Sequence, residues 1–535
     1  MNNAFQSISK SIVKEFLHTA VIIDDRAFTA QKETLPEKTV TPTRLNRTNK
    51  SVKVIKKLPN PYSFHSLDAQ KLISSFASKG LICSVLCPSV VEAIEEESNN
   101  TILAATNSDI VIIDWQIHHH HDGEIALKII KEILENDSVP DRLRFICIYT
   151  GSNDMATKIS DTVKSEIFEQ QHLEFTLDKN NLIFKTNSVV ISLIAKKETP
   201  LPVNYRHLVV SEEQLPEKII EIFTKQYSGL VSNMTMKALS AIRDNSQKLL
   251  AKFSKELDSA FLTHRATISK QIDAENHLIQ FICSEITSIL SNDSLIEPWI
   301  DKKTIEMWYN NKIAEDKEFD YENVQIKRDI ILNCLHSGIA NTTIENLGNK
   351  KKDKLYQKLT QLLSNIYNDN LDLEFARLSL YKTRYKRKRP FLNTGTIIQN
   401  LKTKKYWVCI QPKCDCVRLE DSKHFPLLPL LKELKTTSRI SLPTFEIGNT
   451  NRFWFIPTIP SYCEMYEFKS ALQNKDLIYS KRQKDNWIFL TKNRVQFKFI
   501  VELKDEFAQD ILNKYASIHS RVGTNPSEWL RKITL

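Results

Sequence analysis

Glycine is scarce in this sequence: it contains 9 glycines among 535 residues, where average usage of about 7% would give about 37. No two of the nine lie close enough to form a loop that holds phosphates through its backbone amides. This spacing excludes a P-loop and a dinucleotide-binding fingerprint.

Long apolar runs are also missing. No stretch reaches the roughly 18 consecutive apolar residues of a membrane helix, and Lys14, Glu15 and His18 interrupt the apolar segment 11–25. The chain does not open with the charged region and unbroken apolar region of a secretory signal. Its nine scattered cysteines do not resemble a disulfide framework. These features predict a cytoplasmic protein with reduced thiols.

The composition predicts a folded protein of several domains. Hydrophobic residues make up 41% and charged residues 26%, which is ordinary for globular proteins, and the length corresponds to roughly 3 to 4 domains. The net charge of +10 is concentrated in residues 381–535, which carry 29 Lys and Arg against 14 Asp and Glu. This basic region fits either a solvated surface or an acidic partner such as nucleic acid.

Five short apolar runs alternate with amphipathic stretches up to about residue 210, which is the pattern of an α/β domain. Most of them are nearly continuous and rich in Ile and Val, as expected of parallel strands covered on both faces. The predicted strands are 20–24, 81–87, 109–114, 144–150 and 188–195, and the predicted helices are 66–80, 90–100, 123–137 and 152–168.

Two segments interrupt this alternation within the predicted domain 1–210. Residues 29–62 are rich in Lys, Thr and Pro and predict a long mobile loop. Residues 171–187 alternate polar and apolar side chains on both sides of a Lys-Asn-Asn sequence, which predicts a β-hairpin.

The remaining sequence changes period twice. Residues 211–385 are helical by period and predict a helical domain or coiled-coil linker. Residues 386–535 become strand-like and predict a small, mostly β, basic domain with a closing helix at 503–517. Within 231–292, an apolar stripe recurs at spacings of three, four or seven, which favours a core or a dimer seam over a ligand site. The stripe consists of Leu239, Ile242, Leu249, Leu250, Phe253, Leu257 and Phe261.

Polar residues follow the predicted strands of the first domain. They are the pair Asp24-Asp25 after the first strand, Asp114 after the third, Thr150 after the fourth and Lys196 with Lys197 after the fifth. Ligands of open α/β sheets bind at these carboxyl ends. Three carboxylates at one edge repel one another unless a divalent cation such as Mg²⁺ neutralises them. A metal ion and a lysine would together stabilise phosphoryl transfer to an aspartate.

This ordered set resembles the receiver domain of two-component response regulators. The resemblance covers residues 1–210 and implies a flavodoxin-like, doubly wound, five-stranded parallel sheet. It implies that Asp114 is the phosphoacceptor, with or without autodephosphorylation, and that a histidine kinase is the phosphodonor. The remaining implied roles are Mg²⁺ binding by Asp24, Asp25, Asp114 and the main-chain carbonyl of Gln116, phosphoryl binding by Thr150, and pairing with the phosphoryl group by Lys196 or Lys197.

The sequence also departs from that family. Receivers usually carry an aromatic residue three positions before the lysine and a proline after it. This chain instead has Leu193, or Ile194 if Lys197 is the family's lysine, and no proline follows. The aromatic switch of the family therefore lacks its ring. Haloacid-dehalogenase-type phosphatases also attack with a strand-end aspartate, but they need a second aspartate two residues later. Here that residue is Gln116, which argues against phosphatase chemistry.

Three weaker patterns each have a structural and a functional interpretation. The run His118–His121 favours a solvated loop over a Zn²⁺ or Ni²⁺ site. The residues Cys409, Cys414, Cys416 and His424 favour structural cysteines over a zinc site, because their spacing fits no standard finger. A set of aromatic residues among lysines favours a β-domain core over base stacking. This set is Trp407, Trp454, Trp487, Phe497 and Phe499.

No catalytic or DNA-binding motif is recognised after the receiver-like domain. The architecture and the tail RVGTNPSEWLRKI resemble the receiver proteins of Detocs-type, two-component-like anti-phage defence systems. Within these systems, the resemblance implies the member without an effector enzyme, which acts as a phosphate sink. It also implies a second receiver protein fused to an effector, and the helical segment allows a homodimer. Two alternatives remain: an output module whose basic region binds nucleic acid or another acidic partner, and an unrecognised enzyme.

Overall fold

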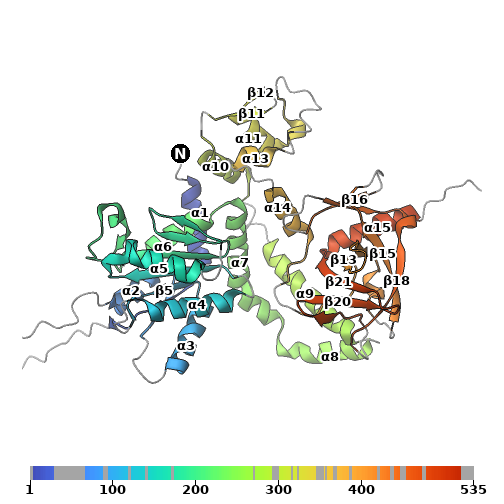
Figure 1. Cartoon of the computed structure of the whole chain (residues 1–535), viewed down its shortest axis with the longest axis horizontal. Helices are drawn as coiled ribbons and strands as arrows, with labels where there is room; N and C mark the ends of the chain where they lie inside the picture. Colours follow the sequence, from blue (N-terminus) through green and yellow to red (C-terminus); the bar gives the residue numbers. More distant parts are fainter. Residues whose placement is uncertain are drawn as a thin grey trace, which may run out of the picture. The chain divides into compact units, whose positions relative to one another are not determined.

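The structure is a computed structural model, which describes most of the chain (Figure 1). The described residues are 4–28, 67–87, 94–117, 122–138, 142–169, 174–268, 271–291, 300–314, 317–321, 324–344, 355, 358–364, 370–384, 388–417, 422–433, 439–445, 453–472 and 477–519. The predicted loop 29–62, the run His118–His121 and the tail after residue 519 lie outside these ranges.

The chain divides into two compact units. The first contains residues 1–318 and 327–342, and the second contains residues 319–326 and 343–535. The first unit therefore holds the receiver-like region together with much of the region predicted as helical.

The first unit is built around five parallel strands. They are β1 (Thr19–Ile23), β4 (Ile82–Leu86), β5 (Ile110–Ile113), β6 (Arg144–Thr150) and β9 (Val189–Lys196). Their order in the sheet is β4-β1-β5-β6-β9, so the chain reverses direction across the sheet between β4 and β5. Such a switch point is where doubly wound sheets bind ligands. All residues of β5, β6 and β9 are buried, as their continuous apolar runs predict.

The prediction of a purely parallel five-stranded sheet was incomplete, because the sheet is mixed and has eight strands. The segment 171–187 contains the antiparallel strands β7 (Thr176–Asp178) and β8 (Ile183–Lys185), and β8 pairs with β9. The short strand β10 (Val209–Val210) also pairs with β9, in parallel. These strands occupy backbone groups of β9 that would otherwise form an open edge. A separate pair joins β2 (Ala27–Phe28) to β3 (Leu67–Asp68).

Helices cover both faces of this sheet (Figure 1). One face packs against α1 (Ala4–Phe16), α2 (Ala69–Ala77), α6 (Leu215–Tyr227) and α7 (Leu230–Lys252). The other face packs against α3 (Ile94–Asn107), α4 (Glu124–Ser138), η2 (Asn153–Ala156), α5 (Lys158–Val163), the π-helical η3 (Lys164–Glu169) and η4 (Val203–Leu208). Helix α1 has no counterpart among the predicted elements, although its apolar side chains Phe5, Ile12 and Val13 are buried.

Further helices follow in chain order. They are η5 (Lys255–Leu257), α8 (Asp258–Thr267), α9 (Gln271–Leu290), α10 (Lys302–Lys312), α11 (Arg328–Ser337), η7 (Ile339–Asn341), α13 (Leu359–Ser364) and α14 (Asn370–Leu380). The strands β11 (Glu318–Tyr321) and β12 (Val324–Lys327) pair with each other. The predicted apolar stripe does not form a core, because Leu239, Leu250 and Leu257 are 49%, 65% and 50% exposed. A dimer seam at this stripe stays a prediction.

The second unit contains a closed antiparallel barrel. Its strands follow the order β18-β15-β14-β13-β21-β20, and pairing of β18 with β20 completes the ring. The six strands are β13 (Thr396–Asn400), β14 (Tyr406–Cys409), β15 (Ser422–Leu430), β18 (Glu464–Lys469), β20 (Asn486–Thr491) and β21 (Gln496–Glu502). Strand β19 (Lys481–Gln483) pairs with β20. A barrel of this kind leaves few open strand edges.

The barrel has an inner and an outer core. Trp407, Phe425 and Phe497 belong to the inner cluster. The outer cluster includes residues of the hairpin β16 (Arg439–Pro443) and β17 (Phe453–Pro457) and of helix α15 (Asp505–His519). The remaining short helices are η8 (Lys413–Asp415) and η9 (Pro460–Tyr462). The prediction of a small β domain with a closing helix agrees with this arrangement. Among the described residues, no helix combines the length and apolarity needed to cross a membrane.

Candidate functional site

Three aspartates meet at the carboxyl edge of the parallel strands. Asp24 and Asp25 follow β1, and Asp114 follows the neighbouring strand β5. Each offers a carboxylate oxygen within 4.8 Å of the others. The backbone N–H of Asp114 donates to the carbonyl of Ile23 at 2.9 Å, which continues the β1–β5 pairing to the site. Parallel pairing therefore brings together residues that are about 90 positions apart in the sequence.

Lys196 bridges two of these carboxylates. Its Nζ lies 2.7 Å from Oδ2 of Asp24 and 3.0 Å from Oδ2 of Asp114. Lys196 is the last residue of β9 and is 5% exposed, whereas the neighbouring Lys197 is exposed. The structure therefore directs Lys196, and not Lys197, towards the acidic cluster.

Burial and charge act together on these groups. Burial raises the pKa of Asp114, Lys196 acts in the opposite direction, and the Asp24 carboxylate adds to the increase. Burial on its own would lower the pKa of Lys196, but the carboxylates of Asp114 and Asp24 outweigh it, so the pKa of Lys196 is raised. Lys196 is thus held as an ammonium ion, and one ammonium ion cannot balance three carboxylates.

The cluster fits a hard divalent cation. Among the described residues, Oδ1 of Asp114 has no hydrogen-bond partner although it is buried. Leaving a buried carboxylate oxygen without a partner is unfavourable unless a ligand satisfies it. Carboxylate oxygens are the ligands that Mg²⁺ prefers, and receiver domains typically bind Mg²⁺ through such an aspartate cluster. The donor set present here is therefore suitable for Mg²⁺.

The other predicted site residues lie on the same edge of the sheet. Thr150 ends β6, which lies between β5 and β9, and its hydroxyl is buried and accepts a hydrogen bond from the backbone N–H of Ser152 at 3.2 Å. Gln116 is two residues after Asp114, and its backbone N–H donates to the Asp114 carboxylate. Leu193 is fully buried in the core, at the position where receivers usually carry an aromatic ring.

Tyr149 is a neighbour of the site that the sequence analysis missed. The Nζ of Lys196 lies 5.8 Å from the centre of the Tyr149 ring, a cation–π contact. The Tyr149 hydroxyl donates to the carbonyl of Val210 in β10 at 2.9 Å. The signal in the sequence was an aromatic residue directly before Thr150, within the predicted strand 144–150.

The segment after Asp114 is held by a glycine. Gly123 has φ +78°, and a Cβ there would lie 2.2 Å from the ring of Trp115, which is buried directly after Asp114. Only a residue without a side chain allows Trp115 to pack here. The tryptophan in turn fixes the backbone beside the phosphoacceptor candidate.

The candidate metal and stacking residues of the second unit do not form comparable sites. The side chains of Cys409 and Cys416 are buried in the inner core, whereas Cys414 and His424 are exposed. Within the described ranges, only Asp24, Asp25 and Asp114 form a cluster of three possible metal-ligating side chains. Most of the aromatic set is likewise core: Trp407, Trp454 and Phe497 are buried, and Trp487 and Phe499 are half-buried.

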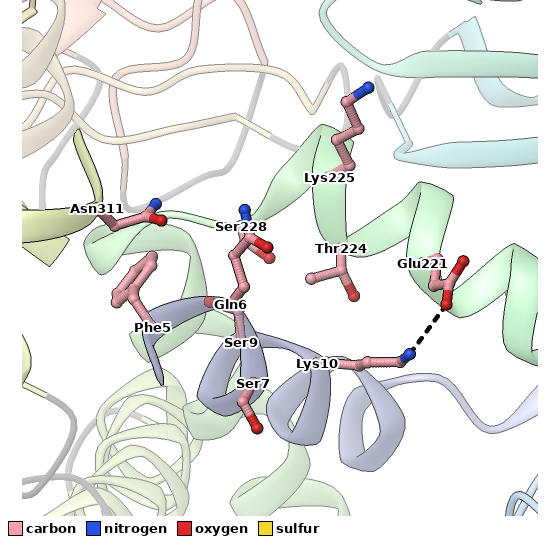
Figure 2. Close-up of a pocket in the computed structure, with 10 residues that line it drawn as sticks. All are labelled: Phe5, Gln6, Ser7, Ser9, Lys10, Glu221, Thr224, Lys225, Ser228 and Asn311. Carbon is pink, nitrogen blue, oxygen red and sulfur yellow. Dashed lines mark hydrogen bonds and ion pairs between the residues drawn. The ribbon is translucent and has the colours of Figure 1, made fainter. Parts of the chain in front are cut away.

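A separate cavity of about 650 Å³ lies beside α1 and α6 in the first unit (Figure 2). Its lining consists of Phe5, Gln6, Ser7, Ser9, Lys10, Glu221, Thr224, Lys225, Ser228 and Asn311. Figure 2 shows the ammonium of Lys10 paired with Glu221, at 3.3 Å. None of its lining residues belongs to the acidic cluster, so the cavity is separate from the site formed by Asp24, Asp25 and Asp114.

Comparison with known families supports the assignment that this geometry suggests. Residues 16–201 match the response receiver domain. No curated protein and no solved structure matches the chain. The match begins at the end of α1, spans all five parallel strands and the β7–β8 hairpin, and ends just after Lys196. Residues 16–201 of this chain are thus a response receiver domain, which supports a phosphoacceptor role in two-component signalling with a phosphodonor such as a histidine kinase.

Proposed function

We propose that this protein accepts a phosphoryl group on Asp114 from the phosphohistidine of a partner kinase in the cytoplasm. The observation that carries the proposal is the buried Oδ1 of Asp114, which has no hydrogen-bond partner among the described residues and lies beside Asp24, Asp25 and Lys196. A carboxylate oxygen placed in this way is a nucleophile surrounded by groups that can stabilise the charge of a phosphoryl group.

In the proposed transfer, an Asp114 oxygen forms a bond to phosphorus as the phosphorus–nitrogen bond to histidine breaks. The bonding electron pair leaves with the histidine nitrogen. Bound Mg²⁺ would supply charge neutralisation for the phosphoryl oxygens. Asp24, Asp25, Asp114 and the Gln116 carbonyl would hold the ion, Lys196 would move from Asp114 to a phosphoryl oxygen, and the Thr150 hydroxyl would donate to another.

A phosphotransfer assay tests this role. Asp114→Asn should abolish labelling by a phosphorylated kinase or a small phosphodonor, because the amide is not a nucleophile. Asp122→Asn is the matched control, because Asp122 is exposed and, like Asp114, follows β5 in the sequence. Full labelling of Asp114→Asn would contradict the assignment of Asp114 as the phosphoacceptor. Loss of labelling in Asp122→Asn alone would indicate that Asp122 is the phosphoacceptor instead.

We further propose that the phosphoryl group ends its path on Asp114, so that the protein is a phosphate sink in a Detocs-type anti-phage defence system. Buried Leu193, in place of the family's switching ring, supports a domain that accepts phosphate without the usual aromatic signal. A sink needs only capture of the phosphoryl group, which the acidic cluster and Lys196 suffice to provide.

The sink and an output protein predict opposite cellular effects. The protein would be expressed with its kinase and with the second receiver protein that carries the effector. For a sink, deletion of the protein or Asp114→Asn should raise unprovoked effector activity and toxicity. Harmless deletion combined with toxicity of the activated wild-type protein would instead support an output module. This cellular result is independent of the labelling assay, so either proposal can fail alone.

A further inference from the structure

Two hairpin turns lie side by side at one end of the barrel. Residues 401–405 connect β13 to β14, and residues 492–495 connect β20 to β21. The backbone N–H of Leu401 donates to the carbonyl of Gln496 at 3.0 Å, and Asn400 pairs with Phe497 between β13 and β21. These contacts make one continuous surface of the two segments, which we name the paired turns.

The paired turns carry a concentrated positive charge. Their exposed basic residues are Lys402, Lys404, Lys405, Lys492 and Arg494, and Lys498 follows in β21. Among the described residues, only Lys492 has an acidic partner within this set, Glu467 at 3.1 Å. The sequence contains no Asp or Glu in 390–414 or in 486–501. Apart from that of Lys492, the charge of this set is therefore not neutralised by a described acidic side chain and is available to an external anion.

Backbone conformation gives a second, independent observation. Lys404 and Arg494 have φ of 58° and 60°, in the left-handed region that favours glycine or asparagine. Lys484, in the turn between β19 and β20, has φ 51°. Every non-glycine residue with positive φ in the described part of the barrel is thus basic. Long cationic side chains occupy turn positions where a smaller residue would cause less strain.

Buried side chains hold both turns in a fixed shape. Oδ1 of Asn400 accepts hydrogen bonds from the backbone N–H groups of Lys402 and Thr403, at 2.9 and 3.0 Å. Oγ1 of Thr491 accepts from the N–H of Val495 at 2.9 Å. The backbone that carries the charges is therefore ordered before any partner binds, which lowers the entropy lost on binding.

The chemistry of the surface indicates the partner. No exposed residue of the segments 401–405 and 492–496 is apolar, whereas protein–protein interfaces have an apolar centre. Interfaces with nucleic acids are polar and strongly cationic. We propose that the paired turns bind the phosphodiester backbone of a nucleic acid. This binding goes beyond the proposed phosphoacceptor role and does not require phosphorylation of Asp114.

Fluorescence anisotropy with the full chain tests the proposal. The probes are a labelled DNA duplex, an RNA duplex and single-stranded DNA, with labelled polyglutamate as the acidic-protein probe. For a DNA duplex, we expect the log affinity to fall with log salt with a slope of about −4.5 to −5.4, which corresponds to five to six phosphate contacts. The triple variant Lys402→Glu, Lys404→Glu, Arg494→Glu should weaken binding more than about tenfold and reduce the slope by about 3.

A charge-matched control distinguishes this surface from the general basicity of the chain. Lys481→Glu, Arg482→Glu, Lys484→Glu changes the net charge equally, in an exposed hairpin at the opposite end of β20. It should leave binding within about twofold of wild type. Equal losses in the two triple variants, binding to none of the three nucleic acids, or tighter binding to polyglutamate would each overturn the proposal.

A second variant separates binding from folding. Lys404→Gly with Arg494→Gly removes two charges and relieves the left-handed strain, so it should unfold at the same or a higher temperature while binding more weakly. Wild-type affinity in this variant would contradict the proposal. Asp114→Asn should bind nucleic acid like the wild type, so failure of nucleic-acid binding and failure of phosphotransfer are distinguishable.

Discussion

Gly123 and Gly80 show how much one side chain can matter at a left-handed backbone position. They share almost the same backbone conformation, with φ of +78° and +81°. A Cβ on Gly80 would meet nothing within 4 Å, whereas one on Gly123 would overlap the ring of Trp115. The two positions therefore separate backbone strain from steric overlap.

We expect Gly80→Ala to lower the free energy of unfolding by about 1 kcal/mol, through left-handed strain alone. Gly123→Ala should lower it by a further 1–3 kcal/mol or so, because Trp115 must shift within a packed core. It should also slow phosphotransfer, since Trp115 follows Asp114. Urea denaturation measures the losses in the free energy of unfolding, and labelling rates of Asp114 measure the effect on phosphotransfer. Equal destabilisation in the two variants would contradict the role assigned to Trp115.

Tyr149 is the residue-scale link between the site and the segment that follows the receiver. Its hydroxyl bonds to Val210, whose strand β10 pairs with β9 at Lys196. We expect Tyr149→Phe to destabilise the protein by about 1–2 kcal/mol, because the buried carbonyl loses its donor. Hydrogen exchange should show faster opening of 209–215, and unchanged exchange there would argue against the link.

At the scale of elements, Arg144 joins two helices to the start of β6. The guanidinium is fully buried and donates to both carboxylate oxygens of Asp137, at 2.5 and 2.8 Å. It also donates to the carbonyls of Ala105 and Ser108 near the end of α3, at 2.9 and 2.8 Å. Arg144 therefore gives hydrogen-bond partners both to carbonyl groups at the end of α3 and to the buried carboxylate of Asp137.

We expect Arg144→Lys to lower the free energy of unfolding by roughly 3–5 kcal/mol, because Asp137 would lose most of its buried partner. Arg142→Lys is the control, since Arg142 is partly exposed and contacts the carbonyl of Thr106. Arg142→Lys should lower the free energy of unfolding by less than about 1 kcal/mol. Chemical denaturation of both variants would measure the difference in the free energy of unfolding. Similar losses in the two variants would contradict the stabilising role assigned to the Arg144 hydrogen bonds.

A second element-scale contact connects α1 and the turn after α2 to α6. The carboxylate of Glu217 in α6 forms ion pairs with three lysines. Its Oε1 lies 2.5 Å from Nζ of Lys10, and its Oε2 lies 3.0 Å from Nζ of Lys79 and 3.6 Å from Nζ of Lys14. The hydrogen bond from Lys10, together with the other lysines, lowers the pKa of Glu217 to about 2. Because the folded-state pKa lies below the unfolded-state value, this stabilisation is complete above about pH 4.5 and is lost as the pH falls towards 2.

We expect Glu217→Gln to lower the free energy of unfolding by about 1–2 kcal/mol at neutral pH, a value reduced by solvent screening of the partly exposed pairs. The difference from the wild type should shrink as the pH is lowered from 4.5 to 2. Glu213→Gln, at an exposed position, should have little effect at any pH. Denaturation at several pH values measures this, and a constant difference would contradict the low pKa.

At the scale of the whole molecule, chemistry concentrates at two places on different units. The acidic cluster belongs to the receiver domain, and the paired turns belong to the barrel. Mg²⁺ should therefore stabilise the receiver selectively, by about 2.7 kcal/mol at a concentration one hundred times its dissociation constant. Asp25→Asn should remove most of this effect, and EDTA should prevent labelling of Asp114. Undiminished labelling in EDTA would exclude the metal requirement.

The sequence by itself determined the receiver strands and the chemical types at their ends. Apolar runs such as 109–114 and 144–150 predict buried strands, because a strand that is covered on both faces needs apolar side chains at nearly every position. Asp24, Asp25, Asp114 and Thr150 could be placed at one edge because parallel strands share a direction. The placement of these residues needs only the strand ends, which the sequence marks by the change from apolar to polar residues.

Tertiary structure alone decided what depends on exact register and on contacts between distant segments. A strand end can shift by one residue, and such a shift would exchange the buried Lys196 for the exposed Lys197. The attachment of β8 and β10 to β9 and the packing of α1 depend on surfaces that no local pattern encodes. The paired turns meet only because β13 pairs with β21, which lies about 100 residues further along the chain, through backbone bonds that are independent of side-chain identity.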